Sequence, residues 1–304
     1  MSTPSERPAA TAAPAGKTTI LTLQEKRRRG EPITMLTAWD YPSAHALDEA
    51  GVDAILVGDS LAMVVLGHPN TLSVTMDEML HHARAVSRGA HRALLIGDMP
   101  FMSYQADRAE AVRNAGRFLQ EAGMNAVKLE GGDAVADKIA AIVSVGIPVM
   151  GHVGLTPQSS NAFGGFRVQG RTAEAARRVL DDALVLEQAG CFAIVIEGVP
   201  EKVAAAITAR LTIPTIGIGA GAGVSGQVLV AHDVLGLFDK FTPRFAKRYA
   251  ELGDEMAAVF KAFKDDVESG AFPGHEHAYA IPEEEWQTFR ASLEARTRSL
   301  RRTS

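Results

Sequence analysis

Four acidic residues lie in or directly after short apolar runs of the sequence, each next to a glycine: Asp59, Asp98, Glu130 and Glu197. A single acid in such a place is more often a helix cap or a loop contact than a catalytic group. Four acids in the same relation to four runs indicate a site, because glycine lets the backbone turn and a ligand approach closely. We therefore expect acid–base or metal chemistry where these runs end.

Three of these acids predict a metal site. Asp59, Asp98 and Glu130 belong to consecutive runs, and neighbouring parallel strands would bring them to about 4.8 Å from one another. Like charges at this distance are unfavourable unless a cation holds them. Oxygen ligands without cysteine favour Mg²⁺, with Mn²⁺ as an alternative. Because alternate side chains of a strand project to the same face, Lys128 projects to the face of Glu130. By the same rule, Asp59 projects to the face of Val57.

Glu197 stands apart from the three other acids. Two strands would separate it from Glu130, so it would face them across the end of the sheet, among the apolar residues 195, 196 and 199. Such surroundings raise the pKa of a carboxyl group and suit a general base. The alternative is a structural salt bridge with a nearby Arg or Lys. His152, on the run between them, is a further candidate for the base.

The runs that carry these residues alternate with segments of helical period from Ile33 onward. The expected strands are 33–40, 54–60, 93–100, 126–131, 148–154, 192–199, 215–221 and 227–236. The expected helices are 43–49, 76–88, 108–121, 134–144, 173–188, 201–210 and 249–267. Eight units of about 30 residues predict a (β/α)₈ TIM barrel, whose chemistry lies at the C-terminal ends of the strands. An open, doubly wound sheet is the alternative.

The two ends of the chain differ from this pattern. Residues 1–16 are mostly Ala, Pro, Ser and Thr and predict a disordered leader without the apolar segment of a secretory signal. Residues 17–274 form the predicted barrel domain, and 275–304 a C-terminal extension with a helix from Pro282. Trp286, Phe289 and Leu293 give that helix an apolar stripe, which would pack on its own barrel or on a neighbouring subunit.

Composition excludes several classes of function. The net charge of −5 offers no basic field for a nucleic acid. Apolar stretches are far shorter than the roughly 18 residues of a membrane span. The single cysteine, Cys191, excludes an intrachain disulfide and a cysteine-rich metal site, and it fits a cytoplasmic protein. We expect small-molecule substrates.

Long motifs in a fixed order run through residues 17–274. They are LTAWDY (36–41), VGDS (57–60), GDMPFMSY (97–104), AVKLEGG (126–132), VMGHVGLTPQ (149–158), GIGAG (217–221) and GQVLVAHDVLG (226–236). In these motifs the chain resembles the ketopantoate hydroxymethyltransferase family. The leader and the residues after about 275 lie outside the resemblance.

The resemblance implies an activity. Members of the family transfer a hydroxymethyl group from 5,10-methylenetetrahydrofolate to 3-methyl-2-oxobutanoate, which gives 2-dehydropantoate for pantothenate biosynthesis. An enolate stabilised by Mg²⁺ makes the aldol-type attack. The resemblance also implies a homo-oligomer, a homodecamer in most members.

The resemblance further assigns roles to residues of the motifs. It makes Asp59 and Asp98 ligands of Mg²⁺ and places Glu130 in or beside the metal shell. Glu197 is the proton acceptor. The keto acid contacts come from the two aspartates and from Ser60 and Lys128, and we add His152 to this set of substrate-binding residues: Asp59, Ser60, Asp98, Lys128 and His152.

Two other functions remain alternatives. One is a metal-dependent keto-acid lyase or mutase of the phosphoenolpyruvate mutase and isocitrate lyase group, which uses similar acids. Those lyases typically carry a catalytic Cys in a Lys-Cys-Gly context, whereas Cys191 lies in Ala-Gly-Cys-Phe-Ala. The other is a barrel that binds metabolites without catalysis.

Overall fold

The structure, a computed structural model, describes residues 16–300, with side chains described to residue 293. The chain divides into two compact units, 1–251 and 252–304, and each is described by itself. The leader predicted for residues 1–16 lies, apart from Gly16, outside the described residues. Within the described part, no helix has the length and apolarity needed to cross a membrane.

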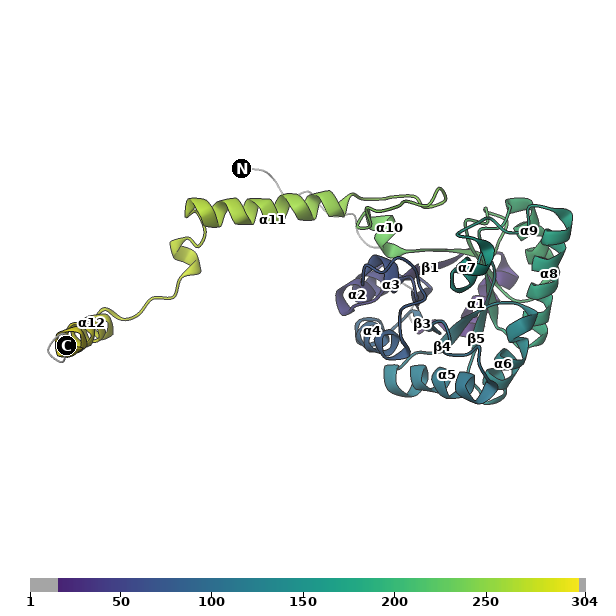
Figure 1. Cartoon of the computed structure of the whole chain (residues 1–304), viewed down its shortest axis with the longest axis horizontal. Coiled ribbons are helices and arrows are strands. Elements are labelled where there is room, and N and C mark those ends of the chain that lie inside the picture. Colours follow the sequence, from purple (N-terminus) through teal and green to yellow (C-terminus); the bar gives the residue numbers. More distant parts are fainter. Residues whose placement is uncertain (1–15, 301–304) are drawn as a thin grey trace. The chain divides into compact units, whose positions relative to one another are not determined.

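The first unit is a closed barrel of eight parallel strands in sequence order, in which β8 pairs with β1 (Figure 1). This confirms the predicted (β/α)₈ barrel and excludes the open sheet. The strands are β1 (Ile33–Thr37), β2 (Ala54–Val57), β3 (Leu94–Asp98), β4 (Ala126–Glu130), β5 (Val149–Gly154), β6 (Ala193–Glu197), β7 (Thr215–Ile218) and β8 (Gly226–Leu229).

Helices surround the strands (Figure 1). They are α1 (Ile20–Arg29), α2 (Tyr41–Glu49), α3 (Leu61–Val64), α4 (Met76–Gly89), α5 (Arg108–Ala122), α6 (Asp133–Ser144), α7 (Ser160–Phe163), α8 (Ala173–Gln188), α9 (Glu201–Arg210) and α10 (Ala231–Leu235), with the 3₁₀ turn η1 (Pro157–Ser159) before α7. Residues 219–225, between β7 and β8, contain no helix.

Local sequence explains where the helices begin and end. At the start of α4, Thr75 Oγ1 accepts from the backbone N–H of Glu78, and the Glu78 carboxylate accepts from the N–H of Thr75. This reciprocal pair satisfies two of the free N–H groups of a helix start. α5 begins after Asp107, whose carboxylate accepts from the backbone N–H of Glu110, and it ends at Gly123, whose φ of 68° favours glycine.

Two apolar cores follow from the alternation of side chains along the strands. One core lies inside the barrel and includes Met35, Leu56, Ile96, Met150 and Val195. The other lies between the strands and the helices that cover them. Side chains with the parity of the inner core point to the barrel axis, so polar residues of that parity at the C-terminal strand ends project into the mouth.

Helix α1 closes the opposite end of the barrel, and the sequence analysis did not predict it. Leu23 of α1 is fully buried in the inner core. Lys26 forms an ion pair with Asp53 just before β2, at 2.6 Å, and Arg27 donates to Ser225 Oγ before β8 and to the carbonyl of Thr208. α1 therefore spans the N-terminal ends of the strands.

The eighth strand is shorter than predicted. The run 227–236 was expected to be one strand, but β8 ends at Leu229 and α10 follows, ending at Gly236 with a φ of 66°. The N–H of Ala231 donates to Thr37 Oγ1 on β1, at 2.9 Å. This bond turns the chain out of the sheet and sets the direction of α10.

The second unit consists of α11 (Leu252–Ser269), the turn η2 (His275–His277) and α12 (Glu283–Leu300). The helix predicted from Pro282 is therefore present. The apolar stripe of α12 includes Trp286 and Phe289, whose ring centroids are 5.9 Å apart. The sequence-based boundary at 274/275 is where the family resemblance ends, whereas the compact barrel unit ends at Glu251.

Candidate active site

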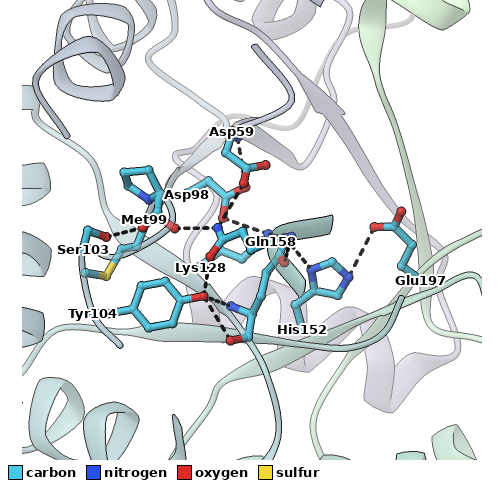
Figure 2. Close-up of polar contacts among 12 residues, drawn as sticks. Asp59, Asp98, Met99, Ser103, Tyr104, Lys128, His152, Gln158 and Glu197 are labelled. Carbon is cyan, nitrogen blue, oxygen red and sulfur yellow. Dashed lines mark hydrogen bonds and ion pairs between the residues drawn. The ribbon is translucent and has the colours of Figure 1, made fainter. Parts of the chain in front are cut away.

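The registers of β3, β4 and β5 bring the predicted site residues together at the barrel mouth. Asp98 pairs with Lys128 across β3 and β4, and Glu130 pairs with His152 across β4 and β5. All four have the parity of the inner core and are almost completely buried. Because parallel strands end at the same rim, their side chains meet there (Figure 2).

Asp59 reaches the same place by a different route. It shares the parity of Val57, which faces the outer core, so strand parity alone would turn Asp59 away from the barrel axis. However, β2 ends at Val57, and Gly58 and Asp59 lie in the turn before α3. The backbone N–H of Asp59 donates to Asp98 Oδ2 at 3.1 Å. The buried side chain of Asp59 thereby joins Asp98, Lys128 and Glu130 in what we call the acidic cluster. The turn, rather than the strand, positions this residue.

A lysine stands among the three acids. Lys128 Nζ lies 2.8 Å from Asp98 Oδ1 and 3.5 Å from Glu130 Oε1. Burial acts to lower the pKa of Lys128, but the charges of Asp98, Glu130 and Asp59 outweigh it and raise the pKa above its usual value. The cation that the sequence argument required between the acids is thus supplied in part by Lys128.

The acids of the cluster differ in charge balance. Burial, followed by the charges of Asp98 and Glu130, raises the pKa of Asp59 well above its usual value. The pKa of Asp98 is also raised, chiefly by burial, although Lys128 opposes this. Burial acts to raise the pKa of Glu130 as well, but Lys128 and His152 lower it overall. Asp59 and Asp98 therefore hold a proton more readily than Glu130 does.

The three predicted metal ligands, Asp59, Asp98 and Glu130, lie close together but do not form a complete set of metal ligands. Among residues 16–300, no group of three or more His, Cys, Asp or Glu side chains is arranged to hold a metal ion. Glu130 instead accepts from the backbone N–H of Gln158 at 3.0 Å and contacts Lys128 and His152. The oxygens of Asp59 and Asp98 are the pair that remains suited to a cation.

Two residues that the sequence analysis did not single out hold the cluster in place. Gln158 Nε2 donates to Asp59 Oδ2 at 3.0 Å and to the carbonyl of Met99 at 2.9 Å. The buried Tyr104 hydroxyl contacts Gln158 Oε1 at 2.7 Å and accepts from the N–H of Glu130 at 3.1 Å. Both residues end quoted motifs, 149–158 and 97–104, and that position was the available signal.

His152 connects the acidic cluster to Glu197. Its Nδ1 lies 3.5 Å from Glu130 Oε1, and its Nε2 lies 3.3 Å from Glu197 Oε2 (Figure 2). Neither nitrogen makes a hydrogen bond of good geometry. Burial and the charge of Lys128 act to lower the pKa of His152, but the two glutamates raise it to about 9. An imidazolium between two carboxylates is the form favoured near neutral pH.

Glu197 lies across the mouth from the acidic cluster, as the sequence predicted. It ends β6, pairs in register with Gly154 and Ile218, and its side chain is 16% exposed. Within the described residues its charged partner is His152, not an Arg or Lys. The structural salt bridge considered from the sequence is therefore absent there, and the carboxylate faces an open cavity.

The cavity joins the site residues. It has a volume of about 430 Å³, and Ser60, Lys128, His152, Glu197 and both aspartates line it. Ser60 is half-buried at the start of α3, beside Asp59. The remaining wall is mostly apolar. It comes from α3, from the segment after β5 that includes Leu155 and Phe166, from β7 and β8, and from residues 238–245. The arrangement offers a charged half for an anionic or chelating substrate and an apolar half next to it.

Solved structures share this fold. Phosphonopyruvate hydrolase in complex with oxalate and Mg²⁺ is 16% identical, with a TM-score of 0.55 over 91% of this chain and 98% of that chain. A 2,3-dimethylmalate lyase, described as a member of the PEP mutase/isocitrate lyase superfamily, is also 16% identical, with a TM-score of 0.55 over 96% of this chain and 100% of that chain. At this identity they show likeness of fold alone.

Sequence relatives are much closer. The 3-methyl-2-oxobutanoate hydroxymethyltransferase of Syntrophobacter fumaroxidans is 58% identical over 87% of this chain and 92% of the relative. The enzyme of that name from Oleidesulfovibrio alaskensis is 58% identical over 83% of this chain and 88% of the relative. A sequence model of ketopantoate hydroxymethyltransferase matches residues 17–275. The chain therefore belongs to the ketopantoate hydroxymethyltransferase family.

Proposed function

We propose that the protein transfers a hydroxymethyl group from 5,10-methylenetetrahydrofolate to 3-methyl-2-oxobutanoate and forms 2-dehydropantoate. The observation that carries the proposal is the division of one cavity between a buried acid–lysine cluster and a lone carboxylate. Asp59, Asp98 and Lys128 stand on one side, and Glu197 stands on the other with His152 between. Removing a proton from the carbon next to a keto group requires such a division.

The donor set at Asp59 and Asp98 fits Mg²⁺. Both residues offer only carboxylate oxygens, which are ligands that Mg²⁺ prefers, and both line the cavity. We propose that these two residues hold the ion and that Glu130 acts beside it, through its contacts with Lys128 and His152. When bound, Mg²⁺ would polarise the keto group and stabilise negative charge on its oxygen.

The residues of the chain then have separate tasks. Lys128 and Ser60 bind and orient the keto acid in the charged half of the cavity. Glu197 takes the proton from C3, and His152 Nε2, 3.3 Å from Glu197 Oε2, holds that carboxylate in place. C3 then forms its bond to the one-carbon unit. The two bonds from that carbon to the folate nitrogens break, and water supplies the hydroxyl oxygen. One folate nitrogen receives the proton taken from C3 and the other receives a proton from the water, so tetrahydrofolate leaves.

Lyase or mutase chemistry with a catalytic cysteine is the second candidate, and the position of Cys191 disfavours it. Cys191 belongs to the outer core, between strands and helices, and it does not line the cavity. Burial raises the pKa of its thiol to about 12, so the reactive thiolate is absent near neutral pH. A barrel that only binds metabolites has no use for a base opposite a charged cluster.

Assembly and location complete the proposal. On the family resemblance we propose a homodecamer in the cytoplasm. Support comes from α11, on which Met256, Val259, Phe260, Phe263 and Val267 are all exposed within this chain. Sedimentation velocity would distinguish a decamer from smaller species.

The test of the activity is direct. The full chain is incubated with 3-methyl-2-oxobutanoate and methylenetetrahydrofolate, with and without Mg²⁺, and 2-dehydropantoate is measured. A parallel incubation without folate in deuterated water follows exchange of the C3 hydrogen. We expect both reactions with Mg²⁺ and neither after chelation. Failure of both in the presence of Mg²⁺ would reject the proposed function.

A further inference from the structure

The cavity extends well beyond the cluster that would bind the keto acid. A volume of about 430 Å³ lies in the range that accommodates drug-sized ligands, and a five-carbon keto acid fills only a part of it. In the closed order of strands, β8 stands opposite β4, which carries Lys128. The second half of the cavity therefore lies across the barrel axis from the charged half. β6, which carries Glu197, is two strands from each.

We call the second half the β8-side chamber and define it by Ile218, Asp233, Phe238, Phe241, Arg244 and Phe245, all of which line the cavity. Its walls are largely aromatic. The ring of Phe245 lies so close to Gly219 that a Cβ there would be 2.6 Å from it, and Phe241 is 64% exposed at the rim. Flat rings at the mouth suit a flat ligand, because aromatic faces stack on one another.

Asp233 is the one acid of this chamber. It lies on α10, directly after β8, and is only 6% exposed. Within the described residues its carboxylate has neither a hydrogen bond nor an ion pair, and burial raises its pKa while the more distant charge of Arg248 opposes this. The carboxylate lines the cavity without a partner from the protein, so its oxygens can accept hydrogen bonds from a ligand there.

We propose that the β8-side chamber binds the pterin ring of the folate and that Asp233 recognises the amino-pyrimidinone edge of that ring. This inference rests on the proposed function. The edge carries two adjacent N–H donors, which match the two oxygens of a carboxylate in a paired hydrogen bond. The faces of the ring contact the phenylalanines. C3 of the keto acid, next to Glu197, then lies between the two halves, where the one-carbon unit must arrive.

The experiment uses the full chain with Mg²⁺ and 3-methyl-2-oxobutanoate present. Calorimetry measures the affinity of tetrahydrofolate for wild type, Asp233→Asn and Phe241→Ala, the second of which changes an exposed ring that folding does not need. Asp239→Asn, an exposed acid that does not line the cavity, is the matched control. Folate-free exchange of the C3 hydrogen is measured for each protein.

We expect Asp233→Asn to weaken tetrahydrofolate binding about ten- to hundredfold, the loss typical of a hydrogen bond to a charged group. Phe241→Ala should weaken it as well, and Asp239→Asn should not. Exchange should persist in all four proteins, because no folate enters that reaction. A tetrahydrofolate analogue without the 2-amino group should bind wild type poorly and should bind Asp233→Asn no worse than tetrahydrofolate does.

Normal tetrahydrofolate binding by Asp233→Asn would overturn the assignment of the chamber. Equal losses of binding and of exchange in this variant would also overturn it, because they would make Asp233 a structural residue. Both outcomes require a wild type that exchanges the C3 hydrogen and makes product. A wild type that does neither rejects the proposed function itself, so the two failures are distinguishable.

Discussion

The backbone N–H of Asp59 donates to the carboxylate of Asp98 at 3.1 Å, which ties the turn after β2 to the end of β3. The two acids are therefore not equivalent. The Asp98 carboxylate positions Asp59 and also pairs with Lys128, whereas that of Asp59 accepts only from Gln158 among the described side chains. Removal of Asp98 should disturb more of the site than removal of Asp59.

We predict that Asp59→Ala and Asp98→Ala both lose Mg²⁺ affinity and turnover, with the larger loss in Asp98→Ala because Lys128 also loses its closest partner. The measurement is the Mg²⁺ dependence of the rate, together with Mn²⁺ binding followed by electron paramagnetic resonance. Asp77→Ala, an exposed acid at the start of α4, is the control. An unchanged Mg²⁺ dependence in either variant would refute the ligand assignment.

We predict that Glu197→Gln loses exchange of the C3 hydrogen by about 10²–10⁴, the usual effect of removing a general base. Keto-acid binding should stay near normal, because Asp98 and Lys128 lie on the other side of the cavity. Deuterium incorporation without folate measures the step alone, and calorimetry measures binding. If Glu197→Gln exchanges as fast as wild type, the role passes to another group such as His152.

The pattern of the sequence predicted the closed barrel and the residues at its mouth, because short apolar runs alternated with helical periods and glycine marked each acid. It missed α1, since a ten-residue helix with only three apolar residues has a weak period. It placed Asp59 by strand parity, although the strand ends two residues earlier. The turn after β2 determines the direction of the Asp59 side chain. The periodicity of the sequence does not show at which residue a strand ends and a turn begins.

The role of Gln158 could not be predicted for another reason. Its side chain joins Asp59 in the turn after β2 to Met99 and Tyr104 in the loop after β3. Contacts between residues 54 to 99 positions apart depend on the closed barrel, not on local sequence.

We predict that Gln158→Ala destabilises the protein by about 1–3 kcal/mol, because it leaves buried acceptors without their donors. Turnover should fall as well, since the Asp59 carboxylate loses the hydrogen bond from Gln158 Nε2 that holds it in position. Urea unfolding and steady-state kinetics measure the two effects, with the exposed Gln120→Ala as the control. Gln158→Glu should be worse than Gln158→Ala, since it adds a carboxylate beside Asp59. The reverse order would contradict this account of the cluster.

Asp48 provides a pH-dependent prediction on stability. This buried residue of α2 accepts from the backbone N–H groups of His91, Arg92 and Ala93 before β3. Burial acts to raise the pKa of Asp48, but these hydrogen bonds and the charge of Arg92 lower it overall. A carboxyl with a lowered folded pKa stabilises the fold above its unfolded pKa of about 3.9 and loses this contribution as the pH falls through the folded value.

Asp48→Asn should therefore reduce the free energy of unfolding at pH 7 by about 1–3 kcal/mol. The difference from wild type should shrink as the pH falls below about 4. Urea unfolding across this range measures it, and the exposed Asp181→Asn serves as the control. A difference that grows toward low pH would show that the sign is wrong.

Helix α1 determines from which end of the barrel ligands reach the cavity. Because Leu23 is fully buried at the base and the interior above it is filled with apolar side chains, the cavity does not extend through the barrel to its N-terminal end. Keto acid, folate and both products must all pass through the same rim. The two substrates therefore reach their halves of the cavity from the same end of the barrel.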